Sequence, residues 1–212
     1  MLPDVGLTGL RLQAGVHCDV QVEHRGGRTD KYGQFVLAVD EPPENPDELF
    51  DRAHAAEQTG NVAEAERLYR LLMKADTTDA SVPFNLGNML RGAGRTVEAE
   101  AALRTATRAN PAFAEAWYNL SDLLDDQGRI DAAVECLRKA LVVAPDYTDA
   151  LFNLALLLQR RGSYAEAKDY WRQYLASDGA SEWAGRARRS LKFCEIQMNS
   201  VAGVQTDTDR AA

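Results

Sequence analysis

The feature that most constrains this chain is an internal repeat with a period of 34 residues. A glycine, an alanine, an aromatic residue, a leucine and an asparagine all recur at that spacing and in one register. The series are Gly60, Gly94, Gly128 and Gly162; Ala65, Ala99, Ala133 and Ala167; Phe50, Phe84, Tyr118 and Phe152; Leu86, Leu120 and Leu154; and Asn85, Asn119 and Asn153. A fixed period of this length indicates a solenoid of stacked repeats.

Each cycle predicts two helices joined by a turn. In residues 114–147, Trp117, Leu120 and Leu124 fall at i, i+3 and i+7, which is one face of a helix. Gly128 suits a turn that needs positive φ, and Pro145 ends the second helix. Small residues at the alanine series let the paired helices approach closely. One such unit cannot bury its apolar faces alone, so stability comes from stacking on the next.

The stretch AEAWYNLSDLLDDQGRIDAAVECLRKALVVAPDY resembles the consensus of the tetratricopeptide repeat (TPR) family. This resemblance implies an all-α, right-handed helix-turn-helix solenoid with four repeats, at 46–79, 80–113, 114–147 and 148–181. The outer repeats deviate, with Arg52 in place of leucine and Tyr174 in place of a small residue. Atypical terminal repeats are expected because each has one face without a neighbouring repeat.

The flanking segments differ from the repeats. Ser181 is a plausible N-cap for a capping helix over 182–197, and the polar residues 198–212 predict a disordered tail. Alternating apolar and polar residues from Val16 to Val22, a glycine-containing loop and the run 34–39 predict a small β-hairpin. With a proline-rich linker into the first repeat, these features make 1–45 a separate segment.

The segment GQFVLAVD, residues 33–40, is similar to a connector found in a group of bacterial proteins. Those proteins place a MerR-like helix-turn-helix before tetratricopeptide repeats and bind DNA through it. The sequence contains no such unit, so DNA binding is not implied. The resemblance leaves two interpretations of the chain open. It is a fragment of such a protein, or it is a variant that has lost the helix-turn-helix domain.

Composition excludes several function classes. The formal charge of −8 and the pI near 5.0 disfavour nucleic-acid binding by this chain. No apolar run approaches the roughly 18 residues that a membrane-spanning helix requires, and the pattern of the first residues leads us to expect no secretory signal. Cys18, Cys136 and Cys194 are odd in number and lack a CxxC spacing. They predict reduced thiols in a cytoplasmic protein.

Convergent catalytic groups are missing from the sequence. His17 and Cys18 are neighbours on a predicted strand and would point to opposite faces, which prevents shared metal ligation. Asp125 and its acidic neighbours read as a charged helix face. There is no phosphate-binding loop or nucleophile elbow. We therefore expect no enzyme activity, no metal and no cofactor.

In the TPR family the first helix of every repeat lines the concave groove. Asn85, Asn119 and Asn153 would then present one amide per repeat, and an amide can pair with both N–H and C=O of an extended peptide. The alternative is that these amides hydrogen-bond within the scaffold. The further groove residues expected from this placement are Asn88, Arg91, Asp122, Asp126 and Arg160. The acidic residues favour a neutral or basic partner segment.

The leading hypothesis is therefore a non-catalytic scaffold that binds a protein or peptide in this groove. One alternative is a self-assembling scaffold, which would form homo-oligomers. Another is the effector or oligomerisation half of a bacterial transcription regulator that lacks its DNA-binding domain.

Overall fold

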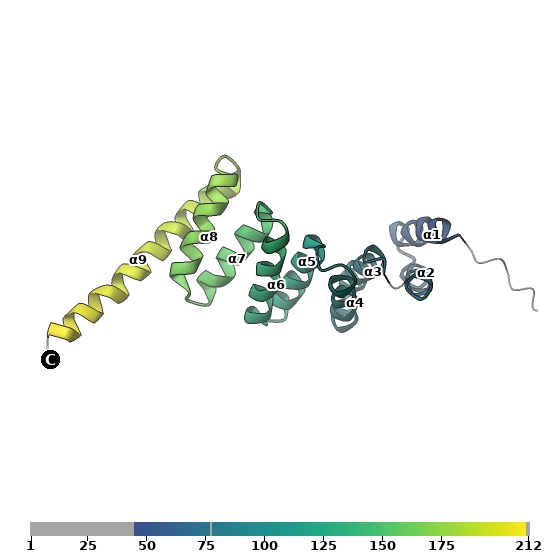
Figure 1. Cartoon of the computed structure of the whole chain (residues 1–212), viewed down its shortest axis with the longest axis horizontal. Coiled ribbons are helices and arrows are strands. Elements are labelled where there is room, and N and C mark those ends of the chain that lie inside the picture. Colours follow the sequence, from purple (N-terminus) through teal and green to yellow (C-terminus); the bar gives the residue numbers. More distant parts are fainter. Residues whose placement is uncertain (1–44, 77, 211–212) are drawn as a thin grey trace, which may run out of the picture. The chain divides into compact units, whose positions relative to one another are not determined.

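A computed structural model describes residues 45–76 and 78–210, with side chains as far as Ser200. Within these ranges the chain forms α-helices and no strand, as the repeat pattern predicts (Figure 1). The predicted hairpin and the MerR-like connector lie outside the described residues. The helices are α1 Pro46–Gln58, α2 Val62–Ala75, α3 Ser81–Gly92, α4 Thr96–Ala109, α5 Ala114–Asp126, α6 Ile130–Val143, α7 Thr148–Arg160, α8 Tyr164–Ser177 and α9 Glu182–Arg210.

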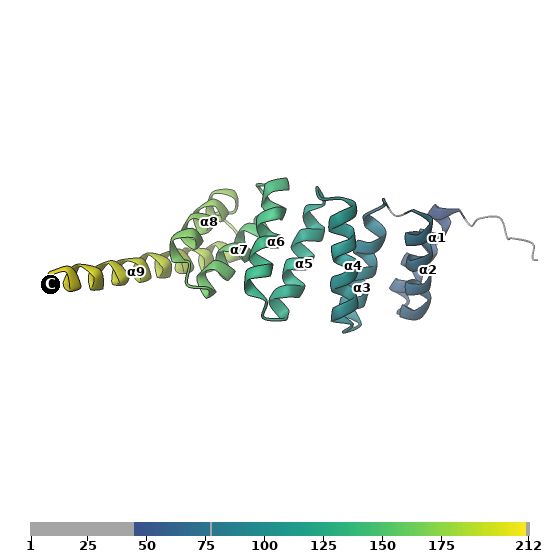
Figure 2. The same ribbon diagram turned by 60° about the horizontal axis from the view of Figure 1, so that its bottom comes forward.

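The helices pack in consecutive pairs. Helix α1 packs on α2, α3 on α4, α5 on α6 and α7 on α8, and each pair falls within one of the four repeat windows. The second helix of a pair also contacts the first helix of the next pair, so α4 packs on α5 and α6 on α7. Figure 2 shows α3 to α6 side by side in this order.

The recurring glycine lies at the turn inside each pair. Gly128 has a φ of 73°, and Gly60, Gly94 and Gly162 have φ between 74° and 83°. Side chains disfavour this left-handed region, which explains why glycine recurs here. The turn closes the end of α5, because Gly128 N–H donates to the Asp125 carbonyl at 2.8 Å and Arg129 N–H to the Leu124 carbonyl at 2.9 Å.

The recurring alanine is the centre of each helix pair. All four members of the series are fully buried, at 0% exposure. Large side chains fill the remaining space between helices, and Tyr69, Leu103, Leu137 and Trp171 are also 0% exposed. Trp117 differs, because it stays partly exposed and its indole N–H donates to the Pro111 carbonyl at 2.9 Å.

An ion pair joins neighbouring repeats on the second-helix side. Glu66 on α2 pairs with Arg95, and Glu100 on α4 pairs with Arg129, which are equivalent positions one repeat apart. Burial opposes ionisation of Glu100, but hydrogen bonds from Arg129 and Gln127 lower its pKa. Between the third and fourth repeats the equivalent positions are occupied by Val134 and Ser163, so this ion pair is absent there.

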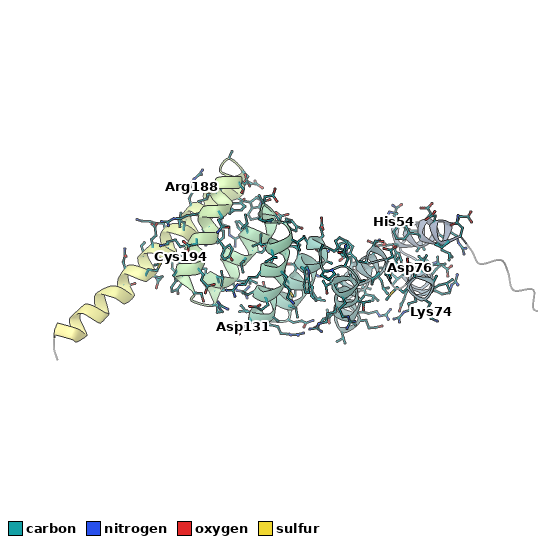
Figure 3. All side chains as sticks on the ribbon, in the orientation of Figure 1. His54, Lys74, Asp76, Asp131, Arg188 and Cys194 are labelled. Carbon is teal, nitrogen blue, oxygen red and sulfur yellow. The ribbon has the colours of Figure 1, made fainter. Side chains whose placement is uncertain are left out.

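The terminal helix α9 covers the last repeat. Ala184, Ala187 and Cys194 on α9 are buried, and the helix packs along α8; Cys194 is labelled in Figure 3. The helix continues to Arg210, which corrects the prediction of a disordered tail for residues 198–210. The physical reason is that this segment contains no proline, and extending an existing helix costs far less than starting one.

Candidate functional site

The three asparagines predicted to form a ladder lie on the first helices of successive repeats. Asn85 is on α3, Asn119 on α5 and Asn153 on α7, and each side chain is partly exposed. We call the surface formed by α3, α5 and α7 around these residues the first-helix face. The 34-residue period thus places one exposed amide on each of three consecutive first helices.

Two of the three amides also bridge neighbouring repeats. Nδ2 of Asn119 donates to Oδ1 of Asn88 on α3 at 2.9 Å, and Nδ2 of Asn153 donates to the Tyr118 hydroxyl on α5 at 3.0 Å. Within the described residues, Asn85 makes no side-chain hydrogen bond, and Oδ1 of Asn119 and of Asn153 accepts none. In Asn119 and in Asn153, therefore, the amide nitrogen holds neighbouring repeats together while the amide oxygen stays open to a hydrogen bond from a ligand.

Charged residues on the first-helix face pair across repeats. Arg91 on α3 lies 2.8 Å from Asp122 and 2.7 Å from Asp126, both on α5. Burial opposes the charge on Arg91, while the two carboxylates raise its pKa. Arg160 on α7 lies 2.7 Å from Asp125. The structure thus brings both predicted groove cations against acidic side chains of α5.

Two acidic residues of the first helices carry a charge that no described cation pairs with. Glu115 begins the first turn of α5 and Asp149 that of α7, and both are exposed. Neither forms an ion pair in the part of the chain that the structure describes. These two carboxylates, rather than Asp122 and Asp126, supply the free negative charge of the first-helix face.

The recurring aromatic residue packs against another aromatic ring in each of the four repeats. Ring centroids lie 6.2 Å apart for Phe50 and Tyr69, 4.7 Å for Phe84 and Phe113, and 5.2 Å for Tyr118 and Tyr147. Phe152 makes edge contacts with Trp171, Tyr174 and Trp183. The last member of the series therefore belongs to a larger aromatic cluster than the others do.

A pocket of about 430 Å³ opens beside that cluster, lined by residues of α5, α7, α8 and α9 and of the α8–α9 turn. We call it the α7–α9 pocket. Its aromatic lining residues are Tyr118, Phe152, Tyr174 and Trp183. Asp149, Asn153, Asp178 and Arg186 supply polar groups to the lining. The pocket therefore contains one amide of the ladder and continues the first-helix face towards α9.

Hydrogen bonds fix the carboxylate of Asp178 at the edge of this pocket. The Tyr174 hydroxyl donates to Oδ2 at 2.7 Å, and the Ser181 N–H donates to Oδ1 at 3.2 Å. Hydrogen bonds from Ser181 and Tyr174 lower the pKa of Asp178, so it stays ionised at neutral pH. Sequence reasoning noted Tyr174 as a deviation from the repeat pattern but missed its role here.

Among the side chains that the structure describes, in residues 45–76 and 78–200, no group of three or more His, Cys, Asp or Glu could hold a metal ion. Both described cysteines are buried. Burial raises the pKa of the Cys136 thiol to about 11, which keeps it in the unreactive protonated form. None of the described helices combines the length and the apolar character needed to span a membrane.

Solved structures of repeat proteins share the fold. A MamA protein aligns with a TM-score of 0.64 at 21% identity, over 73% of this chain and 82% of that one. YrrB, described as a TPR protein with an unusual peptide-binding site, aligns with a TM-score of 0.64 at 18% identity, over 76% and 82%. A tetratricopeptide repeat protein from Parabacteroides merdae aligns with a TM-score of 0.64 at 20% identity, over 73% and 60%.

Family models give the sequence-level comparison. No curated protein matches the chain. Models described as tetratricopeptide repeat match residues 49–70, 90–146 and 149–181. Together these matches cover more than half of the 212 residues and fall on the helix pairs described above. The chain belongs to the tetratricopeptide repeat family.

Proposed function

We propose that the chain is a non-catalytic scaffold that binds an extended segment of a partner protein along its first-helix face. Solenoid repeat proteins bind partners on extended surfaces of this kind. The observation that carries the proposal is the row of exposed amides on α3, α5 and α7. It is supported by YrrB, a structural relative described as having an unusual peptide-binding site.

The amides suit the backbone of an extended peptide. A peptide strand exposes N–H and C=O groups along its whole length, and an amide side chain can pair with either. Asn85 offers both its donor and its acceptor, while Asn119 and Asn153 offer Oδ1 to a peptide N–H. The partner's sequence would matter little for these contacts.

Charge favours a neutral or basic partner segment. Glu115 and Asp149 are the exposed carboxylates of the face without an ion pair among the described residues, and the chain carries a formal charge of −8. Complementary charge speeds encounter more than it strengthens the final complex. We therefore expect the association rate, more than the dissociation rate, to fall with added salt.

Fluorescence anisotropy with a fluorescein-labelled pool of random nonapeptides tests the proposal. Changing Asn85, Asn119 and Asn153 together to Ala should weaken binding about tenfold, since unpaired peptide groups would remain. Asn85→Ala alone removes no scaffold hydrogen bond, so its effect on binding reports the ligand contact directly. Asn199→Ala on α9 is the matched control. Unchanged binding by a folded triple variant would contradict the proposal.

Self-assembly is a second candidate, favoured by exposed apolar residues on α9. Phe193 is 42% exposed and Ile196 is 53% exposed. A second copy of the chain could cover them. Light scattering across a concentration series separates the two functions, because self-assembly requires the mass to rise with concentration, whereas a peptide-binding monomer keeps one mass.

A further inference from the structure

The α7–α9 pocket is lined by groups that are not needed for asparagine side chains to bind a peptide backbone. Aromatic rings form its walls, and the carboxylates of Asp149 and Asp178 add negative charge at its edge. Aromatic faces next to carboxylates are the surroundings that a cation prefers. Burial raises the pKa of the Tyr174 hydroxyl, and Asp178 and Asp149 add to the rise.

The pocket already holds one cation from the chain itself. The guanidinium carbon of Arg186 lies 5.6 Å from the ring centroid of Phe152 and 5.9 Å from that of Trp183. Arg186 forms no ion pair and no hydrogen bond with any other described residue. Its neighbour Arg188, labelled in Figure 3, donates instead to the Gly179 carbonyl at 2.5 Å. Ring contacts alone therefore hold Arg186, and such contacts are weak on an exposed surface.

We infer that the α7–α9 pocket receives one basic side chain of the bound segment, which takes the place of Arg186 against Phe152 and Trp183. This inference rests on the proposed function, because the amide ladder would deliver the segment to the pocket through Asn153. Arginine fits better than lysine, since a planar guanidinium stacks on aromatic rings and pairs with a carboxylate in one geometry. An acidic side chain would meet Asp149 and Asp178 and be repelled.

Three fluorescein-labelled nonapeptide pools test this, each random except at the central position, which is arginine, citrulline or glutamate. Citrulline keeps the shape of arginine without its charge. With the full chain, the arginine pool should bind about tenfold more tightly than the citrulline pool. Asp149→Asn and Trp183→Ala should each shrink that difference. Asp149 is exposed and forms no ion pair among the described residues, so its substitution keeps the fold.

Arg186→Ala gives the sharpest signature, because removing the internal competitor should raise affinity for the arginine pool about threefold and leave the citrulline pool unchanged. Arg189→Ala on the same helix and Asp169→Asn on α8 are matched controls that remove one charge outside the pocket. Equal binding of the arginine and citrulline pools, or tighter binding of the glutamate pool, overturns the inference and leaves the scaffold function standing. Failure of all pools to bind overturns the scaffold function itself.

Discussion

The guanidinium of Arg129, in the turn before α6, donates hydrogen bonds to both carboxylate oxygens of Glu100 on α4, at 2.7 and 2.8 Å. Glu100 is only 8% exposed, and Arg104, one turn further along α4, pairs with it as well. This contact ties α4 of the second repeat to the turn between α5 and α6 of the third. It therefore helps to hold these two repeats against each other, and neither residue belongs to α3, α5 or α7.

Stability should fall in acid because of this pair. The pKa of Glu100 is lowered from 4.5 in the folded chain, so its contribution is present at neutral pH and is lost as pH falls through the lowered pKa. Glu100→Gln should reduce the free energy of unfolding by about 1–2 kcal/mol at pH 7, and the difference from the natural chain should shrink in acid. Urea unfolding at several pH values measures it. Asp169→Asn serves as a control, and an equal loss at every pH would contradict the ionic account.

Overpacking the helix pair should destabilise the third repeat. Ala133 on α6 has 0% exposure, so Leu at this position has no free space. We expect Ala133→Leu to lower the free energy of unfolding by about 1–3 kcal/mol. Ala165→Leu adds the same atoms at an exposed position of α8 and should change stability little. A neutral result for Ala133→Leu would mean that the helices are not paired through this residue.

Two glycines of α3 should respond in opposite directions to the same substitution. A Cβ on Gly87 would lie 2.8 Å from Cγ of Leu103 and 3.3 Å from the Ala99 carbonyl oxygen of α4, so Gly87→Ala should destabilise. A Cβ on Gly92 would meet nothing within 4 Å, so Gly92→Ala should stabilise by about 0.5–1 kcal/mol. Thermal unfolding of both variants checks the sign. Equal effects would show that α3 and α4 do not approach closely at Gly87.

Buried thiols should resist alkylation in the folded chain. Burial raises the pKa of Cys136 to about 11 and also raises that of Cys194. At pH 8 little thiolate is present and access is restricted, so iodoacetamide should label both residues slowly. Site-resolved mass spectrometry with and without urea measures the difference. Rapid labelling of Cys136 in the native state would contradict its buried position on α6.

Much of the fold follows from periodicity alone. Gly128 and its equivalents predict turns because positive φ is a local requirement, and the fully buried alanines follow from the same register. The true end of α9 was not predictable in this way. A polar segment without an apolar stripe gives no sign of whether it prolongs a preceding helix, as residues 198–210 do.

The candidate site could be predicted only in part. The sequence period puts Asn119 on its helix. Its hydrogen bond to Asn88, however, joins two neighbouring repeats and depends on the packing of α3 against α5. Likewise Trp183 and Arg186 read as surface residues of a capping helix. They reach Phe152 because α9 turns back along α8, and that geometry is tertiary rather than local.

Hydrogen exchange with the random nonapeptide pool bound to the full chain tests the central claim most directly. The account predicts slower backbone exchange in the segments covering α3, α5 and α7, because the asparagine side chains of these helices would contact the peptide. Exchange in α4 and α6 should stay unchanged. Protection confined to α4 and α6 would contradict it, because the bound segment would then contact the second helices of the repeats.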